Sequence, residues 1–222
     1  MRLPSEMTRV KAAFRPLITR RYFKTHPVPK LQLGSGDQIA AGWLNADKFD
    51  SRADIYLNVY GRFPFRDESF KYVYSEHLLE HLAIHKVRHF FSEVFRVLES
   101  DGVARLTVPD LELFARNYVG RNDEFFRPIV TRHRDWTSEG NEKSWIVRTN
   151  GASFMSLANI RFFHHRWMYD FETIESCALA VGFTKALKQQ FRVGISSEVA
   201  SLDRAHRKSE TLYVDLIKMN VR

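Results

Sequence analysis

The side chains best suited to moving protons gather in one short segment of this chain. His77, Glu80 and His81 stand close together there, and His164 and His165 form a second pair much later in the sequence. A neutral imidazole can accept a proton near neutral pH, so these residues suit general-base chemistry on an acceptor hydroxyl.

A histidine also recurs at every fourth position, at His77, His81, His85 and His89. On one continuous helix four imidazoles would share a face, and two such histidines with a carboxylate can hold zinc. However, we expect the segment to change from turn to helix near Ala83, and Glu80 does not stand in the His-Glu-x-x-His order. The sequence therefore predicts no metal site.

A second segment suits ligand binding. Leu31–Asp37 carries Gly34-Ser35-Gly36 at the exit of an apolar run, where glycines allow a tight turn and the amides can face a ligand. Ile39 stands where a dinucleotide fingerprint has its third glycine, and Asp47 comes earlier than in a nicotinamide site. Asp47 can still accept hydrogen bonds from both ribose hydroxyls, so a nucleoside without a pyrophosphate fits better than NAD.

The surrounding pattern alternates short apolar runs with helix-like stretches. The clearest helix is Ile84–Leu98, and Asp110 and Asp170 are placed to cap two more, the second over Phe171–Val181. Strands are expected at Lys30–Leu33, Trp43–Asp47, Asp54–Leu57, Tyr72–Ser75, Val103–Val108, Thr184–Phe191 and Thr211–Lys218. Such alternation predicts an α/β fold with an open, mostly parallel sheet covered on both faces.

Composition narrows the class of protein. The chain has 222 residues, a net charge of +8 and Cys177 as its single cysteine, which excludes an internal disulfide framework. No apolar run reaches the roughly 18 residues of a membrane span. We expect a soluble, cytoplasmic protein of one domain, 30–222, preceded by a basic leader, 1–29. The leader is expected to be a solvated helix, or an arm for peripheral contact with an anionic membrane or nucleic acid.

One stretch, about 119–169, fits no strand–helix repeat and is rich in aromatic and basic residues. An insertion of this length in a compact domain is usually functional. The alternative is a small helical subdomain in which the aromatic side chains only form a core. Both interpretations remain open at the level of sequence.

The ordered motifs resemble predicted bacterial class I S-adenosylmethionine-dependent methyltransferases of the methyltransferase type 11-like kind. The resemblance is carried by Leu31–Asp37, Gly42–Asp47, Phe63–Phe65, Ser69-Phe70, Tyr74–Leu82, Glu93–Leu98, Arg105–Leu111, Met168–Asp170, Ala180–Phe183 and Thr211–Val214. It implies a Rossmann-like αβα sandwich with a seven-stranded sheet, an antiparallel last strand, and S-adenosylmethionine as cofactor.

By position, the resemblance implies which residues bind the cofactor: Leu33, Gly34, Ser35, Gly36, Asp47, Asn58, Ser75 and His77. Gln32 departs from the family, which commonly has an acidic residue there. For catalysis we predict His81 as the general base, because it follows the fourth strand on the cofactor edge. His77 and His165 are the other candidate catalytic residues.

The resemblance implies methyl transfer, and we expect O-methylation of a small-molecule or glycan hydroxyl. Relatives are often associated with polysaccharide biosynthesis, so a sugar hydroxyl is expected by analogy. One alternative is an RNA methyltransferase, which the positive charge and the interleaved aromatics would suit. Another is a catalytically silent cofactor-binding partner subunit, which the altered glycine loop would allow.

Overall fold

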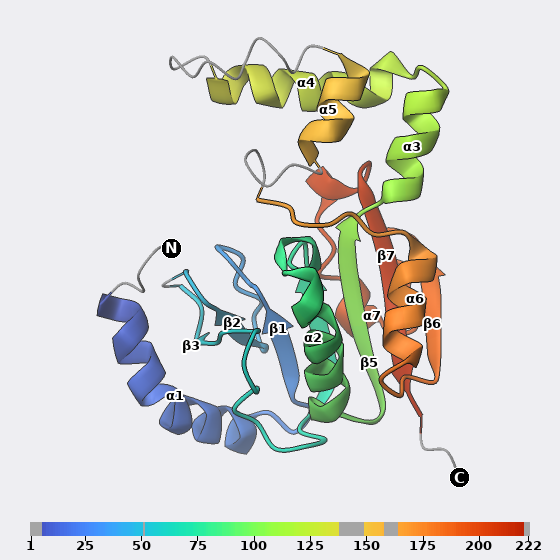
Figure 1. Ribbon diagram of the computed structural model, residues 1–222. Coiled ribbons are helices and arrows are strands. Elements are labelled where there is room, and N and C mark those ends of the chain that lie inside the picture. The colour runs from blue at the N-terminus through green and yellow to red at the C-terminus, as the bar shows by residue number, and fades with distance from the viewer. Residues whose placement is uncertain (1–5, 51, 138–148, 158–163, 220–222) are drawn as a thin grey trace.

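The fold is an α/β sandwich built on one mixed sheet (Figure 1). A computed structural model describes residues 6–50, 52–137, 149–157 and 164–219. The sheet order is β3-β2-β1-β4-β5-β7-β6. Its strands are β1 (Lys30–Leu33), β2 (Leu44–Asp47), β3 (Ile55–Tyr56), β4 (Phe70–Glu76), β5 (Leu98–Pro109), β6 (Lys185–Gln189) and β7 (Thr211–Lys218). Neighbours from β3 to β5 are parallel, and β7 is antiparallel to β5 and β6, which confirms the predicted fold class.

The predicted strands are all present, and most of them differ from the prediction in length. The β3 strand shrinks to two residues because its ladder with β2 has only two pairs, Ala46 with Ile55 and Asp47 with Tyr56. The β5 strand is longer than predicted because residues on either side of the Asp101-Gly102 turn still pair in the sheet. The β7 strand has the predicted bounds.

Helices cover the two faces of the sheet unequally. The helices α2 (Ile84–Val97) and α6 (Phe171–Leu179) pack on one face, where Phe90, Val94 and Ile174 are buried in the main core. The short α7 (Ser197–Ala200) packs on the other face, with Val199 against Tyr74. Figure 1 shows α2 and α6 in front of the sheet and α7 behind it.

Beneath α7 the second face holds a buried charge network. The Arg105 guanidinium donates to both carboxylate oxygens of Asp203, at 2.9 and 2.7 Å, and to Asp215 at 2.7 Å. All three side chains are fully buried. Because each charge has a hydrogen-bonded partner, the network can persist inside the protein.

Two carboxylates cap helices as predicted. The Asp110 side chain accepts from the Leu113 amide at the start of α3 (Leu111–Val119), and Asp170 accepts from Thr173 at the start of α6. Each bond satisfies one of the amides that a first helical turn leaves without a partner. Both caps follow the carboxyl edge of the sheet, so they fix the chain where the site is built.

The leader is a helix that packs on the domain. The helix α1 (Glu6–Thr25) ends just before Pro27, and Tyr22 is buried against the main core. The Tyr22 hydroxyl donates to the carbonyls of Lys30 and Gly42, which ties α1 to the chain on both sides of the glycine loop. None of the described helices is long and apolar enough to cross a membrane.

The insertion forms a helical unit with a small core of its own. It contains the end of α3, α4 (Asp123–Thr137) and α5 (Asn150–Leu157), which stand above the edge where β4 and β5 end (Figure 1). Phe114, Phe126 and Leu157 are buried there, so several aromatics serve packing, as the subdomain interpretation expects. Residues 138–148 and 158–163, with Trp145, Phe162 and Phe163, lie outside the described residues.

Candidate functional site

The glycine loop makes its turn as predicted, but its amides point elsewhere than expected. Gly34 and Gly36 have φ angles of +66° and +53°, which only glycine adopts without strain. The amides of Gly34 and Ser35 donate to the Ala46 carbonyl, at 2.8 and 3.2 Å, rather than facing a ligand. The expectation of ligand-facing amides was therefore wrong for these two, because β2 takes their hydrogen bonds.

Asp47 organises this loop from the end of β2. Its Oδ2 accepts from the Gly36 amide at 3.0 Å, and its Oδ1 accepts from the amides of Phe49 and Asp50. Each carboxylate oxygen can accept about two hydrogen bonds, so Oδ2 keeps capacity for a hydroxyl. Asp47 thus holds the loop in place and can also bind a ligand there.

The backbone of the loop is open on one side, and buried hydroxyls lie nearby. A Cβ on Gly36 would meet nothing within 4 Å, so the backbone is open on that side. Ser35 and Ser75 are buried, and their hydroxyls have no hydrogen-bond partner among the described residues. Asn58 follows β3, and its side chain accepts from the Tyr60 amide, which is an ordinary turn contact. Buried hydroxyls next to open backbone are what a polar cofactor would satisfy.

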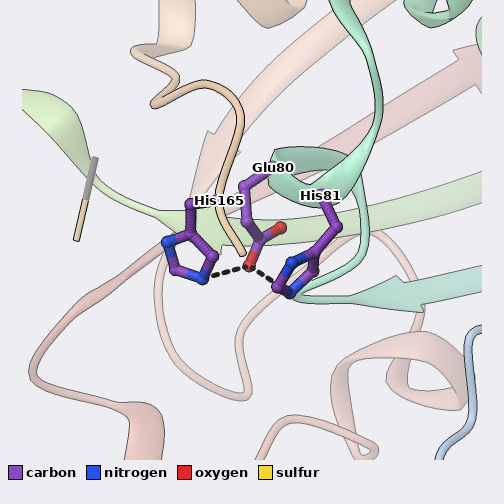
Figure 2. Close-up of side chains that lie close together, drawn as sticks. All are labelled: Glu80, His81 and His165. Carbon is purple, nitrogen blue, oxygen red and sulfur yellow. Dashed lines mark ion pairs between the residues drawn. The ribbon is translucent and has the colours of Figure 1, made fainter. Parts of the chain in front are cut away.

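On the other side of β4, a buried carboxylate lies among three imidazoles. Oε1 of Glu80 lies 3.2 Å from His77 Nδ1, 4.0 Å from His81 Nε2 and 3.9 Å from His165 Nε2. Figure 2 shows the rings of His81 and His165 turned toward this oxygen from opposite sides. The structure thus brings together all three predicted catalytic histidines, around Glu80, which the sequence analysis named beside His77 and His81.

Backbone hydrogen bonds explain how His165 reaches this place. The Glu80 carbonyl accepts from the amides of Arg166, at 2.7 Å, and Trp167, at 3.3 Å. Glu80 itself lies in a one-turn 3₁₀ helix, Leu79–His81, which ends at an extended Leu82 before α2 begins. The predicted change from turn to helix near Ala83 is confirmed, so the four evenly spaced histidines do not share one helix.

The electrostatics of the cluster follow from burial. Burial of the Glu80 carboxyl tends to raise its pKa, but the neighbouring His77, His81 and His165 outweigh this effect and leave the pKa below the usual range. Burial lowers the pKa of His165 to about 4, so this ring is neutral at neutral pH. An ionised carboxylate therefore faces a neutral imidazole.

A hydrogen bond fixes which ring nitrogen of neutral His81 carries the proton. Nδ1 of His81 lies 3.3 Å from the His164 carbonyl, which can only accept, so neutral His81 keeps its lone pair on Nε2. Nδ1 of His77 lies 3.2 Å from both Glu80 Oε1 and Arg207 Nη1, and Nε2 of His77 lies 2.9 Å from the Thr211 hydroxyl. His77 is thus held toward β7, and its polar atoms are engaged away from the glycine loop.

Residues 31–106 match the family model described as a methyltransferase domain. The matched segment contains the glycine loop, Asp47 and the Glu80–His81 turn, and the sheet has the seven strands and the antiparallel last strand that the resemblance implied. This segment of the chain is similar to methyltransferase domains, which supports the family resemblance.

Solved structures similar to this chain have low sequence identity to it. An S-adenosylmethionine-dependent methyltransferase from Archaeoglobus fulgidus is 13% identical, with 96% of this chain and 95% of that chain covered and a TM-score of 0.47. The Haemonchus contortus phosphoethanolamine N-methyltransferase 2, in complex with phosphomonomethylethanolamine and S-adenosylhomocysteine, is 13% identical, with 92% and 52% covered and a TM-score of 0.47. No curated protein sequence matches the chain. The assignment accordingly stands on the family match.

Sequence reasoning named Glu80 beside His77 and His81 but did not place it at the centre of the cluster. The signal was present, because Glu80 is an acidic residue inside the apolar run Leu78–Leu82 and such a residue is buried only with partners. What the sequence could not supply was the partner His165, which lies 85 positions later and is reached through backbone hydrogen bonds. Among the described residues, Glu80, His81 and His165 also form a group that could hold a metal ion.

Proposed function

We propose that this methyltransferase binds S-adenosylmethionine over the glycine loop and methylates a hydroxyl group of a small molecule or glycan. The observation that carries the proposal is the state of His81. Its Nδ1 faces a carbonyl, its Nε2 lone pair lies beside the buried carboxylate of Glu80, and its side chain remains 37% exposed. This arrangement suits a base that a substrate can reach.

The cofactor half of the site would be formed by the residues that the resemblance indicates. Leu33, Gly34 and Gly36 provide the backbone turn, Asp47 would accept from the ribose hydroxyls, and Ser35, Asn58 and Ser75 offer further polar groups. When bound, S-adenosylmethionine supplies a methyl group on a positively charged sulfur that is a ready leaving group. The protein must then align the acceptor with it, which provides much of the rate.

Proton removal would belong to the acceptor half. His81 Nε2 would take the proton of the acceptor hydroxyl as that oxygen receives the methyl group. The resulting imidazolium carries a positive charge next to ionised Glu80, which stabilises it. His165 and His77 act as positioning residues, because both lie against the same carboxylate and are less exposed than His81.

The leader helix suggests where the enzyme works. On α1 the side chains of Val10, Phe14 and Leu17 are 50%, 56% and 65% exposed, and exposed Arg20 and Lys24 continue the same helix. An apolar stripe next to cations suits the surface of an anionic membrane. This would place the methyltransferase beside a membrane-associated glycan.

Sedimentation with anionic vesicles tests this contact. The amount of protein that sediments should fall in Phe14→Glu. It should stay unchanged in the control Ile84→Glu, whose exposed side chain lies on α2. Equal sedimentation of both variants would argue against membrane contact.

A transfer assay tests the proposed function. Enzyme and methyl-labelled S-adenosylmethionine are incubated with sugars, phenols, amines and RNA, and the bond formed is identified by nuclear magnetic resonance. We expect a new O-methyl group on a hydroxyl acceptor. Label on an amine or on RNA would contradict hydroxyl specificity, and cofactor binding without transfer to any acceptor would favour a silent partner subunit.

A further inference from the structure

Three potential metal-ligand atoms converge in the acceptor half of the site. Glu80 Oε1, His81 Nε2 and His165 Nε2 all lie within 4.8 Å of one another (Figure 2). Glu80 is fully buried, and neither of its carboxylate oxygens accepts a well-aligned hydrogen bond from a described residue. A buried carboxylate with unsatisfied oxygens is costly unless a cation or donor approaches it.

Few donors surround this carboxylate. The proton of neutral His81 is on Nδ1, toward the His164 carbonyl, so Nε2 presents a lone pair to Glu80. His77 Nδ1 lies 3.2 Å from Oε1 and is placed to donate to it. His165 faces the same oxygen with its Nε2, at 3.9 Å. A lone pair of His81 therefore lies beside a buried negative charge, and a cation is the species that such a place attracts.

We propose that Glu80, His81 and His165 bind a first-row divalent cation, Zn²⁺ in particular, and that this binding stops methyl transfer. Two imidazoles and one carboxylate are a known ligand type for zinc, with a further position left open. Binding would use the same Nε2 lone pair of His81 that accepts the substrate proton. The cation and the proton therefore compete for one site, and the metal-bound enzyme has no free base.

The geometry requires a modest closure. Two ligands bound to zinc lie about 3.4 Å apart at a tetrahedral angle, and Glu80 Oε1 lies 3.9 Å from His165 Nε2 and 4.0 Å from His81 Nε2. His81 lies in a one-turn helix and His165 in a stretch without regular secondary structure. Rotation of the two side chains can bring their rings closer to the carboxylate. The exposed side of His81 provides a route of entry.

Binding is measured first, by calorimetry with zinc chloride alone on the full, tag-free chain. We expect one Zn²⁺ per chain in the wild type. Glu80→Gln keeps the shape of the side chain but removes the charge, and it should weaken binding by about 100-fold or more, as should His165→Ala. His85→Ala removes an exposed histidine on α2 and should bind zinc as the wild type does. Co²⁺ in the same site should give the visible absorption of a low-coordinate centre.

The result that would overturn the site is equal zinc affinity in the wild type and Glu80→Gln, since zinc would then bind elsewhere. Thermal melting checks that each variant is folded. If His165→Ala does not fold, the comparison of the wild type with Glu80→Gln decides the test.

Inhibition is measured next, and only this part rests on the proposed function. Methyl transfer should fall over the same zinc range in which binding saturates, and a chelator should restore it. Zinc that binds through these residues without changing turnover would leave the site standing and contradict His81 as the base. Zinc that raises turnover would overturn the inhibitory role.

Discussion

The two halves of the candidate site are built in different ways. In the cofactor half, Gly36 and Asp47 are only 11 positions apart in the sequence. The loop is joined to β2 by the bonds of Gly34 and Ser35 to Ala46 and of Gly36 to Asp47. In the acceptor half, Glu80 and His165 are far apart in sequence and meet through the amides of Arg166 and Trp167. Site residues joined by local contacts can be predicted from a sequence motif, whereas site residues joined by distant contacts come together only in the folded chain.

The largest effect should come from the sheet beneath the acceptor half. Arg105→Met leaves the carboxylates of Asp203 and Asp215 buried without their partner, which should cost about 3–5 kcal/mol of unfolding free energy. Urea denaturation followed by circular dichroism measures this loss. As a control, Lys188→Met breaks a solvent-exposed pair with Glu112 and should hardly change stability. Similar losses of unfolding free energy in Arg105→Met and Lys188→Met would mean that the buried network contributes no more than an exposed ion pair.

In the cofactor half, Asp47→Ala should weaken binding of S-adenosylmethionine by about 1–3 kcal/mol, because the ribose hydroxyls and the loop amides lose their acceptor. Asp47→Asn keeps one carbonyl oxygen, so its affinity for the cofactor should lie between those of Asp47→Ala and the wild type. Calorimetry is the measurement, with Asp37→Ala on the exposed part of the loop as control. An unchanged affinity in Asp47→Ala would remove this residue from the site.

The two halves meet at Gly34, so a substitution there tests their coupling. A Cβ at this position would lie 3.1 Å from the Leu78 side chain and would force a φ of +66° on alanine. Gly34→Ala should cost about 1–2 kcal/mol of stability and shift the turn that carries Glu80 and His81. Gly61→Ala, with a Cβ 3.8 Å from the Asn58 carbonyl, is the matched control. If both variants melt at the wild-type temperature, the loop does not need this conformation.

The smallest effect concerns the support of the cofactor half by α2. Burial raises the pKa of the Glu93 carboxyl, but Arg96 and the Phe63 amide outweigh burial and hold the pKa below its usual range. The stabilisation is therefore present above the ordinary glutamate pKa of about 4.3 and is lost as the pH falls through the lower folded value. Glu93→Gln should cost about 1 kcal/mol at pH 7 and flatten the acid dependence, as seen by thermal melting across pH. If the melting temperatures of Glu93→Gln and the wild type fall equally steeply with decreasing pH, the Glu93–Arg96 ion pair does not stabilise the protein in this way.

The difference between the halves also explains how far sequence could lead. The Thr211–Lys218 strand, the caps at Asp110 and Asp170 and the loop at Gly34 follow from local pattern and appeared as expected. The direction of the loop amides could not be predicted, since the Ala46 carbonyl competes for them.

The acceptor half was only partly predictable. His77, His81 and His165 were chosen by residue type, and the structure adds the carboxylate that joins them. Its position depends on backbone bonds between distant segments, and on a φ of +47° at His77 that no local rule indicates. The assignment of these histidines to catalysis stays a prediction.

One comparison tests the account most directly: turnover and cofactor affinity in His81→Ala. If the acceptor half removes the proton and the cofactor half binds S-adenosylmethionine, kcat should fall by about 10²–10⁴-fold, while calorimetry with S-adenosylhomocysteine should give the wild-type affinity. His85→Ala should match the wild type in both measurements. Full turnover with normal cofactor affinity in His81→Ala, or equal losses of affinity and thermal stability, would contradict the role of His81 as the base.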